Sequence, residues 1–466
     1  MLDEQIKNYH TTNIVVKKNQ TDLLKYCEDS TKQAKLFKNA VIYRCRQLYI
    51  ARLKNYNNLT EHEIKVLNEF DKIKVDCRYK SHGIPSYEDF DKMFKNSNNP
   101  DYYNDLASQI TQNIIKDVLY NFKAYFESLK LFNKNKSKFN GKPKIPCYVK
   151  GDKTTLTISN QDAVIYQYDK LSKNKIKKLK QKNRFYKNGC FLKLPKTNCK
   201  VHLGDLKINN LIEVIIQPFY DTYKICIVDN IEPISYTKLN ENCIIGIDLG
   251  VKNFVSVSNN CGLTPFVING NGLKAYNQYY NKIIANLKSQ LAVNQYNSRK
   301  IQMINRKRYH KIKDFYNKTA SYLVQYCLIN NIGTIIIGKN YQWKNKINIG
   351  KENNQHFCYI AHSEFINKLQ EQAAKYGINV IINEESYTSK ASFLDDDIIP
   401  VYGECDAPEF SGKRIKRGLY QSKNGTLINA DINGASNIIK KVIKNAFDDI
   451  KDFDYLTTTV NSINMW

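Results

Sequence analysis

One stretch of the chain, residues 242–258, constrains the fold more than any other. Isoleucines and valines dominate it, and they follow strand-like spacing on both sides of Gly250. This pattern predicts two strands joined by a tight turn. A single acid, Asp248, lies at the end of the first strand, where a buried carboxylate is costly unless it is paired, hydrogen-bonded or bound to a metal. Three interpretations follow: an acid that caps the turn, a metal ligand, or a turn that cradles phosphate.

The charge of the 466-residue chain limits its partners. There are 71 Lys and Arg against 44 Asp and Glu, which gives a net charge of +27. Such an excess favours a polyanion, most simply nucleic acid. The sequence contains no apolar run of membrane-spanning length and no signal-peptide pattern at its start. We therefore expect a cytoplasmic protein, nucleoid-associated in a prokaryote, that is not secreted and binds no membrane.

The first half of the chain divides by composition. Residues 1–20 hold a lone predicted strand, and residues 21–135 show the apolar spacing of helices. From 136 to 240, short strand patterns alternate with turns, which is typical of a small β-barrel that the first strand could join. Within it, residues 136–200 carry 18 Lys and Arg against three Asp, a net charge of +15. This density favours salt-sensitive contact with phosphates over a merely solvated face.

Residues 241–466 alternate strand and helix patterns, and acids lie at the ends of several predicted elements. Glu384 and Glu385 end a strand that begins at Ile378, and Asp431 opens a helix. Carboxylates that converge stay ionised together only around a divalent cation. Mg²⁺ takes such oxygen ligands, and two ions can clamp both oxygens of a phosphodiester displacement. Taken singly, Asp431 could be a helix N-cap and one of the two glutamates a surface acid.

Three segments together resemble a known family. They are 245–253 (Ile-Gly-Ile-Asp-Leu-Gly-Val-Lys-Asn), 384–390 (Glu-Glu-Ser-Tyr-Thr-Ser-Lys) and 429–437 (Asn-Ala-Asp-Ile-Asn-Gly-Ala-Ser-Asn). In this order they resemble the TnpB proteins of insertion sequences, which are relatives of the Fanzor proteins and of compact type V CRISPR nucleases. The segment 410–420 resembles a subset that carries it in place of the zinc ribbon. Only Cys405 lies where the ribbon's four cysteines are expected, and none of the 12 cysteines forms a Cys-x-x-Cys pair.

The resemblance implies a multidomain α+β protein. Its parts would be a wedge β-barrel (1–20 and 136–240), an inserted helical recognition domain (21–135) and a RuvC-like, RNase-H-fold nuclease domain (241–466, with loop 388–428 in place of a zinc ribbon). The implied activity is that of a metal-dependent endodeoxyribonuclease of a transposable element. It would use a guide RNA from the element's end and cleave double-stranded DNA beside a short adjacent motif. The implied cofactor is Mg²⁺ or Mn²⁺, as two ions, with no zinc; the oligomeric state stays open.

The site residues follow position by position. Asp248 and Asp431 match the family's first and last catalytic acids. The usual middle glutamate follows an apolar strand, where this chain has Gly338 and no acid nearby. Some members of the wider family resemble this chain in carrying that glutamate on the strand before the Tyr-Thr-Ser motif, a position that Glu385, three residues before Thr388, fits best. Neighbouring strand residues face opposite ways, so we expect only one of Glu384 and Glu385 to reach the metal. The predicted metal ligands are Asp248, Glu385 and Asp431, with Glu384 as the less favoured catalytic candidate.

Basic residues are the predicted nucleic-acid contacts, and two rival functions stay open. The contacts are Lys142, Lys144, Lys175, Lys177, Lys178, Lys180, Arg184, Arg299, Arg306, Arg308, Arg414 and Arg417. The first rival is an ATPase, because residues 246–250 also resemble the first phosphate loop of actin and the heat-shock chaperones. The second phosphate loop of that family, of Asp-x-Gly-x-Gly type, is missing. The other rival is a catalytically decayed protein that binds guide RNA and DNA and assists or regulates transposition.

Overall fold

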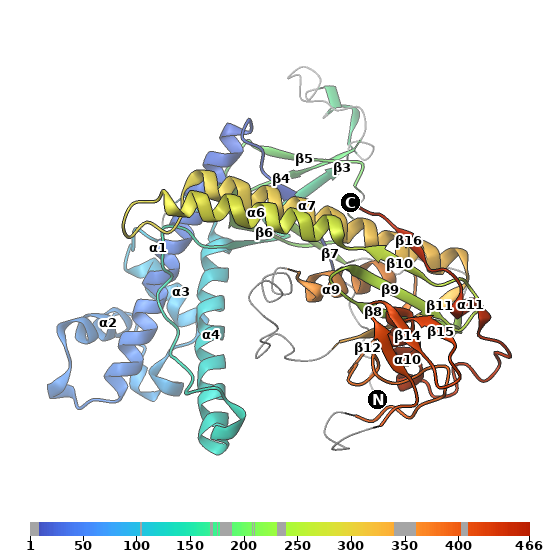
Figure 1. Ribbon diagram of the computed structural model, residues 1–466. Coiled ribbons are helices and arrows are strands. Elements are labelled where there is room, and N and C mark those ends of the chain that lie inside the picture. Colours follow the sequence, from blue (N-terminus) through green and yellow to red (C-terminus); the bar gives the residue numbers. More distant parts are fainter. Residues whose placement is uncertain are drawn as a thin grey trace. The chain divides into compact units, whose positions relative to one another are not determined.

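The computed structural model describes residues 9–102, 105–167, 171–174, 176–177, 189–206, 208, 210–230, 239–339, 360–401 and 409–466. The chain forms two compact units, residues 1–231 and 232–466. The first runs from blue to green in Figure 1 and the second from yellow-green to red. Within the described residues, no helix is both long and apolar enough to cross a membrane.

Helices make up most of residues 21–138 in the first unit. The four α-helices are α1 (Thr21–Arg52), α2 (Glu61–Asp71), α3 (Tyr87–Asn96) and α4 (Ser108–Lys134). Short 3-10 turns accompany them at η1 (Tyr56–Asn58), η2 (Cys77–Tyr79), η3 (Ser81–Gly83) and η4 (Lys136–Lys138). Helices α2 and α3 each begin with a capping box, Thr60 with Glu63 and Ser86 with Asp89, which satisfies two otherwise unpaired amides at each start.

The strands of the first unit form two sheets. One has the order β1-β7-β6-β2, built from β1 (Tyr9–Val15), β2 (Leu156–Ser159), β6 (Asn210–Phe219) and β7 (Thr222–Asn230). The other joins β3 (Val164–Gln167), β4 (Cys190–Lys193) and β5 (Lys200–Gly204). In the described part of the chain these strands pair as two hydrogen-bonded sheets, and the small β-barrel stays a prediction. Alternating patterns identify strands but not which edges pair, because pairing joins residues far apart in the chain.

Helices and sheets of the first unit share one core. Phe37 of α1, Phe122 of α4 and Leu156 of β2 belong to a single cluster of buried apolar residues, which also contains Ile227 of β7. Strand β1 pairs antiparallel with β7 along its whole length. The helical segment 21–134 is thus inserted between two strands of one sheet and packs against that sheet.

The second unit is built on a six-stranded sheet of order β12-β11-β8-β9-β10-β16. The strands are β8 (Asn240–Leu249), β9 (Asn253–Asn259), β10 (Phe266–Asn269), β11 (Ile332–Gly338), β12 (Asn379–Asn383) and β16 (Asn461–Ile463). β8, β9 and β10 run antiparallel in sequence, and β11 and β12 continue the sheet parallel to β8. β11 is buried over its full length, as expected for an apolar central strand covered on both faces.

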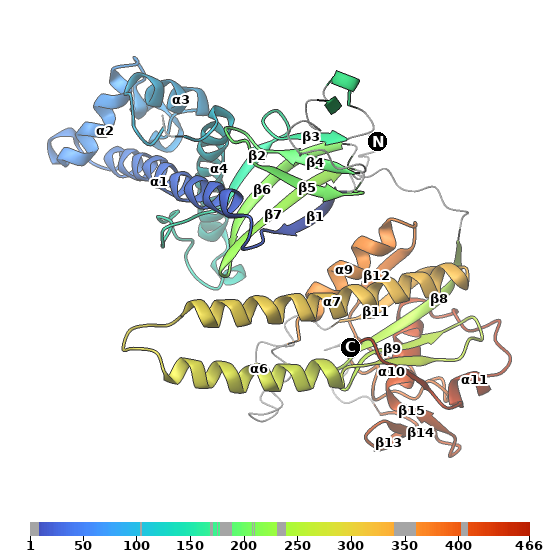
Figure 2. The same ribbon diagram turned by 90° about the horizontal axis from the view of Figure 1, so that it is seen from above.

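Helices cover both faces of this sheet. Helices α6 (Asn271–Ser289) and α7 (Arg299–Ile329) run side by side as a hairpin (Figure 2), and α7 packs on α9 (His362–Ala374). Helix α10 (Ala430–Val442) lies on the other face and is followed by the short α11 (Asp454–Thr457). A small antiparallel sheet precedes α10 in the chain and consists of β13 (Lys413–Lys416), β14 (Leu419–Gln421) and β15 (Leu427–Asn429). Ile245 and Ile247 belong to the core under α7 and α9, whereas Ile244 belongs to the core under α10. Because strand residues alternate between faces, Gly246 and Asp248 share the α10 face with Ile244.

Candidate functional site

Small residues let helix α10 approach strand β8 closely. A Cβ on Gly246 would lie 2.3 Å from the Ala435 carbonyl oxygen, and one on Gly434 would lie 3.0 Å from Asp248 Oδ2. The buried hydroxyl groups of Ser258 and Ser436 are 2.7 Å apart and hydrogen-bonded. The absence of side chains at Gly246 and Gly434 therefore brings the start of α10 to the end of β8.

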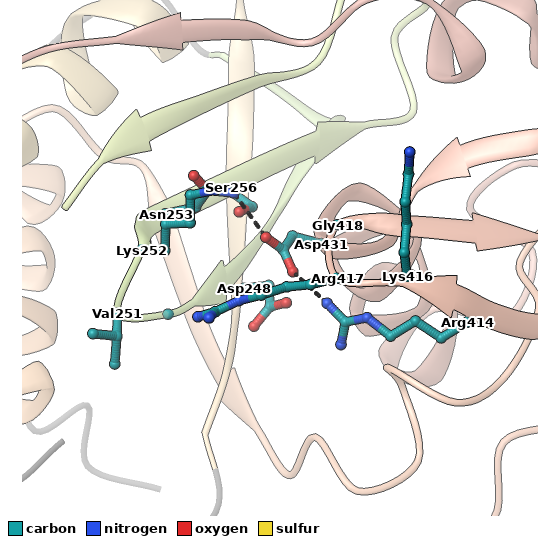
Figure 3. Close-up of a pocket in the computed structure, with 11 residues that line it drawn as sticks. Asp248, Val251, Lys252, Asn253, Ser256, Arg414, Lys416, Arg417, Gly418 and Asp431 are labelled. Atoms are coloured by element: carbon teal, nitrogen blue, oxygen red, sulfur yellow. Dashed lines mark hydrogen bonds and ion pairs between the residues drawn. The ribbon is translucent and has the colours of Figure 1, made fainter. Parts of the chain in front are cut away.

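Asp431 does not cap its own helix. The N-cap is Asn429, whose Oδ1 accepts hydrogen bonds from the amides of Asp431 and Ile432 at 2.9 and 3.3 Å. The Asp431 carboxylate instead accepts a hydrogen bond from Asn253 Nδ2 at 2.8 Å and pairs with Arg414 Nη2 at 3.4 Å (Figure 3). The interpretation of Asp431 as a helix N-cap is therefore wrong, and its carboxylate faces the end of β8.

The end of β11 carries no acid, but an acid lies over it. Ile336 and Ile337 pair with Gly246 and Ile247 in parallel register, and one further step places Gly338 beside Asp248. A Cβ built on Gly338 would lie 2.6 Å from Glu385 Oε2 and 3.1 Å from Glu385 Cβ. The Glu385 carboxyl group, which comes from the segment after β12, thus occupies the space that a side chain at 338 would fill.

The side chain of Glu384 makes different contacts, with Lys441 and Ser386. Its Oε2 pairs with Lys441 Nζ at 2.5 Å, and its Oε1 accepts a hydrogen bond from the Ser386 amide at 2.6 Å. Burial opposes ionisation, but the hydrogen bonds from Lys441 and Ser386 hold the pKa of Glu384 below its usual value. Glu384 is therefore an ionised partner of Lys441, whereas Glu385 is the glutamate beside Asp248.

Burial and neighbouring carboxylates raise the pKa values of Asp248 and Glu385. Burial, and then the charges of Glu385 and Asp431, raise the pKa of Asp248 to about 8, with Arg414 acting in the opposite direction. Burial, and then the charge of Glu384, raise the pKa of Glu385 to about 7, opposed by Lys441. Like charges in a partly dry site behave in this way when no cation is bound between them. The site therefore favours the arrival of positive charge.

A cavity of about 590 Å³ opens beside Asp248 and Asp431 (Figure 3). Its floor includes Asp248, Ser256 and Asp431, and its rim carries four cations: Lys252, Arg414, Lys416 and Arg417. Arg414 is 43% exposed, so its guanidinium is accessible from solvent. Acids beneath a basic rim suit a phosphate diester whose negative charge the rim attracts.

The three acids do not form a preassembled metal cage. Among the residues that the structure describes, no three His, Cys, Asp or Glu side chains are grouped closely enough to hold an ion together. Asp431 is held by Asn253 and Arg414 instead. The donor atoms are all carboxylate oxygens, which hard divalent cations prefer.

The predicted nucleic-acid contacts have different environments. Lys142, Lys144, Lys177 and Arg299 are exposed, and Arg414 and Arg417 line the cavity. Lys175, Lys178, Lys180 and Arg184 lie outside the described residues, and Arg306 is half-buried. Arg308 donates a hydrogen bond to Asn277 Oδ1 at 2.9 Å and lies over the Tyr280 ring, so part of its role is to join α7 to α6.

Sequence reasoning missed two polar residues at this place. Asn253 lies inside the first motif, and its position after the β8 turn could have suggested a partner for an acid. Lys441 gave no sequence signal, since its contacts with Glu384 and Ser386 join residues 57 and 55 positions apart.

The fold and the cavity define a mixed α+β protein of two units whose second unit carries a carboxylate site beneath a basic rim. Comparison with known families is consistent with this class. Residues 227–344 match the OrfB_IS605 family, described as a probable transposase, and residues 362–438 match the Cas12f1-like TNB domain. Over these two segments the second unit is therefore similar to the OrfB_IS605 family and to the Cas12f1-like TNB domain.

Solved structures are similar at low identity. A Cas12f1–sgRNA–target DNA complex matches at 12% identity over 93% of this chain and 99% of that chain, with a TM-score of 0.44. The mini RNA-guided endonuclease CRISPR-Cas_phi3 matches at 12% identity over 98% and 93%, with a TM-score of 0.46. A CRISPR-Cas12f ternary complex matches at 12% identity over 87% and 80%, with a TM-score of 0.32. No curated protein matches the sequence.

The family match corrects two predictions. We predicted a subset in which residues 388–428 replace a zinc ribbon, with two Mg²⁺ or Mn²⁺ ions and no zinc. Residues 362–438 match the TNB domain, a zinc-finger domain, so both predictions were wrong. They relied on the spacing of cysteines, whereas the family likeness extends over the whole segment, including β13–β15 and α10.

The zinc that this domain class implies does not fit the ligands present here. His362 and Cys405 are the only histidine and cysteine between 362 and 438. Cys405 lies outside the described residues, and His362 is hydrogen-bonded to the Gly250 carbonyl oxygen. A structural zinc site takes four Cys or His ligands. We therefore assign no chemical step to zinc.

Proposed function

We propose that this protein is an RNA-guided DNA endonuclease of a transposable element. It would cleave double-stranded DNA beside a short adjacent motif by hydrolysing phosphodiester bonds with a divalent cation. The observation that carries the proposal is that Asp248 and Asp431 line a cavity rich in cations, with the Glu385 carboxyl group over Gly338 next to Asp248. In the absence of a cation this cluster is electrostatically unfavourable, which is the property of a site that binds one.

The topology of the second unit supports a RuvC-like, RNase-H-type assignment. Three antiparallel strands in sequence, β8, β9 and β10, are extended by the parallel strands β11 and β12 on the β8 side. Asp248 is at the carboxyl end of β8, and the Glu385 carboxyl lies over the carboxyl end of β11. The two acids thus lie at one edge of the sheet, Asp248 from β8 and Glu385 from the segment after β12, and ligands of such sheets commonly bind at this edge.

In this proposal each residue has a defined role. Asp248, Glu385 and Asp431 would hold the divalent cation, which activates water and stabilises the leaving oxygen when bound. Asn253 keeps Asp431 oriented through its 2.8 Å hydrogen bond. Arg414, Lys416 and Arg417 attract the DNA backbone to the cavity. Asp248 and Glu385 must each lose a proton before they bind a cation, since their pKa values are raised to about 8 and about 7.

The guide RNA would bind mainly to the first unit. We propose a wedge from residues 1–20 and 136–240, a recognition domain from 21–135 and a nuclease domain from 241–466. The excess of 18 Lys and Arg over three Asp in residues 136–200, with Lys142, Lys144 and Lys177 exposed, supports contact with a polyanion. The OrfB_IS605 and Cas12f1-like TNB matches support a guide-dependent nuclease over a simple nucleic-acid clamp. The position of the Glu385 carboxyl group over Gly338 also supports an active nuclease over a decayed protein, because Glu385 would replace the acid that is absent at Gly338.

Cleavage of guide-matched DNA tests the proposal. The full chain would be purified with its co-purifying RNA, and the RNA would be sequenced to define a matching duplex. We expect cleavage that EDTA abolishes, and loss of cleavage with retained RNA and DNA binding in Asp248→Ala and Asp431→Ala. The exposed Asp449→Ala is the matched control and should cut like the wild type. Cleavage at the wild-type rate by Asp248→Ala and Asp431→Ala would overturn the site, and wild-type binding without cleavage would favour the decayed protein.

A further inference from the structure

We propose that Lys441 is a positioning residue that holds Glu385 in the carboxylate site. The inference rests on the proposed function, because it concerns the same acids. It starts from a contrast: Asp248 belongs to a strand, whereas Glu385 belongs to the irregular segment that follows β12. A metal-ligating acid on such a segment needs an anchor that fixes its main chain.

Lys441 contacts the residues on both sides of Glu385. Its Nζ donates to Glu384 Oε2 at 2.5 Å and to the Ser386 carbonyl oxygen at 2.9 Å. The side chain of Lys441 is only 6% exposed, so these bonds are largely shielded from water. One ammonium group therefore links the residue before Glu385 to the residue after it.

The same segment is tied from within as well. Ser386 N donates to Glu384 Oε1 at 2.6 Å, and Thr388 Oγ1 donates to the Glu385 carbonyl oxygen at 2.8 Å. Gly338 lies beneath and leaves room for the Glu385 carboxyl group. The main chain around Glu385 is thus held by the Lys441 link and by the turn, and the space over Gly338 accommodates its carboxyl group.

Helix α10 carries both Lys441 and Asp431. Asp431 is near its first turn and Lys441 near its last, so one helix sets the positions of one acid directly and of Glu385 through Lys441. A buried ion pair is weak evidence for stability, because its desolvation offsets much of the Coulomb attraction. Its geometric effect is larger: it ties the exit of β12 to the helix that bears the last acid.

The test compares Lys441→Met with Lys440→Met. Lys440 is the next residue on the same helix and also partly buried, but it pairs with Asp396 and donates to the Asp397 carbonyl oxygen at 3.1 Å. Three quantities would be measured: guided cleavage rate, Mn²⁺ binding by electron paramagnetic resonance, and hydrogen exchange of the amides of residues 385–391. Mn²⁺ is chosen as the probe because its binding can be counted without catalysis.

We expect Lys441→Met to weaken Mn²⁺ binding and to slow cleavage, each by roughly 10–100-fold, with DNA binding unchanged. Exchange of the 385–391 amides should rise in Lys441→Met, whereas Lys440→Met should change none of these quantities by more than about twofold. Equal exchange and equal Mn²⁺ affinity in the two variants would overturn the inference. If Lys441→Met does not fold, Lys441→Gln, which keeps one donor without the charge, replaces it.

The two proposals fail in different ways. If the wild type with its RNA does not cut matched DNA, the proposed endonuclease is wrong. The exchange comparison still decides whether Lys441 anchors Glu385. If the wild type cuts and Lys441→Met matches Lys440→Met throughout, only the role of Lys441 is wrong.

Discussion

The carboxyl ends of β8 and β11 lie side by side in one sheet but carry their acids differently. At the end of β8, Asp248 is part of the strand, and the strand's hydrogen bonds set its place. At the end of β11 stands Gly338, and the carboxyl group over it comes from Glu385, 47 residues later in the chain. The parallel register places the ends of β8 and β11 next to each other, but only β8 carries an acid within the strand itself.

The comparison of the two strand ends shows that a carboxylate site is defined by the positions of its carboxyl groups, whichever segment supplies them. A residue within a strand is held in place by the backbone hydrogen bonds to the neighbouring strands. A residue beyond the strand needs other contacts, which Lys441 and Ser386 supply here. Glu385 should therefore depend on its neighbours more than Asp248 does.

Neutralising Glu384 and Glu385 one at a time tests which of the two glutamates acts together with Asp248. We expect Glu385→Gln to slow guided DNA cleavage by at least about 100-fold, because it removes the charge of the proposed cation ligand beside Asp248. Glu384→Gln keeps hydrogen-bonding atoms near Lys441 and should cost less than about tenfold. Single-turnover cleavage rates would be compared at saturating DNA. A larger loss in Glu384→Gln would reverse our assignment.

A glutamate placed on β11 itself, at position 338, tests whether the position of the carboxyl group matters more than the segment that supplies it. A Cβ at Gly338 clashes with Glu385 Oε2 and with Ile438 Cδ1, the flexible end of a side chain, at 2.6 and 2.5 Å. Gly338→Glu alone should therefore destabilise the fold by about 1–3 kcal/mol. Combined with Glu385→Ala, the new glutamate gains room, and we expect it to recover about tenfold of the cleavage lost in Glu385→Ala. Gly338→Gln in the same background is the control, and equal recovery by both would show that the charge is not responsible.

The pH dependence of stability tests the electrostatic cost of Asp248. Its pKa is raised to about 8 in the fold, against about 3.9 in an unfolded chain. The folded state thus binds a proton that the unfolded state releases, so this residue lowers the free energy of unfolding as pH rises from about 4 to 8. Without a divalent cation, Asp248→Asn should raise that free energy by about 1–2 kcal/mol at pH 8, and by less at pH 4.5.

Urea unfolding in EDTA at both pH values would measure this effect. The exposed Asp449→Asn serves as the control and should change stability little at either pH. A gain in Asp248→Asn that is no larger at pH 8 than at pH 4.5 would contradict the raised pKa.

Removing one cation from the basic rim of the cavity should have only a modest effect on DNA binding. Arg417 lines the cavity and is exposed. Arg417→Ala should weaken DNA binding two- to fivefold at low salt and reduce the slope of log affinity against log salt by about 1. Lys444→Ala, another exposed cation of the same unit, is the control. An unchanged salt slope in Arg417→Ala would remove Arg417 from the DNA path.

Local patterns predicted much of the second unit. The alternating apolar residues of 242–258 predicted the β8–β9 hairpin, and the apolar run after Ile332 predicted the buried strand β11. The alternation of strand and helix patterns predicted for residues 241–466 is also present, with the α6–α7 hairpin between β10 and β11. These elements were predictable because strand and helix periods are set by neighbouring residues.

Long-range contacts were not predictable in the same way. The pairing of Lys441 with Glu384 and the hydrogen bond between Asn253 and Asp431 join distant segments. The family of residues 362–438 was also misjudged, since its sparse cysteines hid the likeness to a TNB domain.

The sequence by itself determined which acids were available: Asp248, Glu384, Glu385 and Asp431, each at the end of an element. Only the tertiary structure decided their partners. The register of β8 and β11 places Gly338 beside Asp248, and the space above that glycine receives Glu385, while Lys441 draws Glu384 away. The physical reason is that a side chain's ionisation and role depend on the charges and space around it, which come from residues remote in sequence.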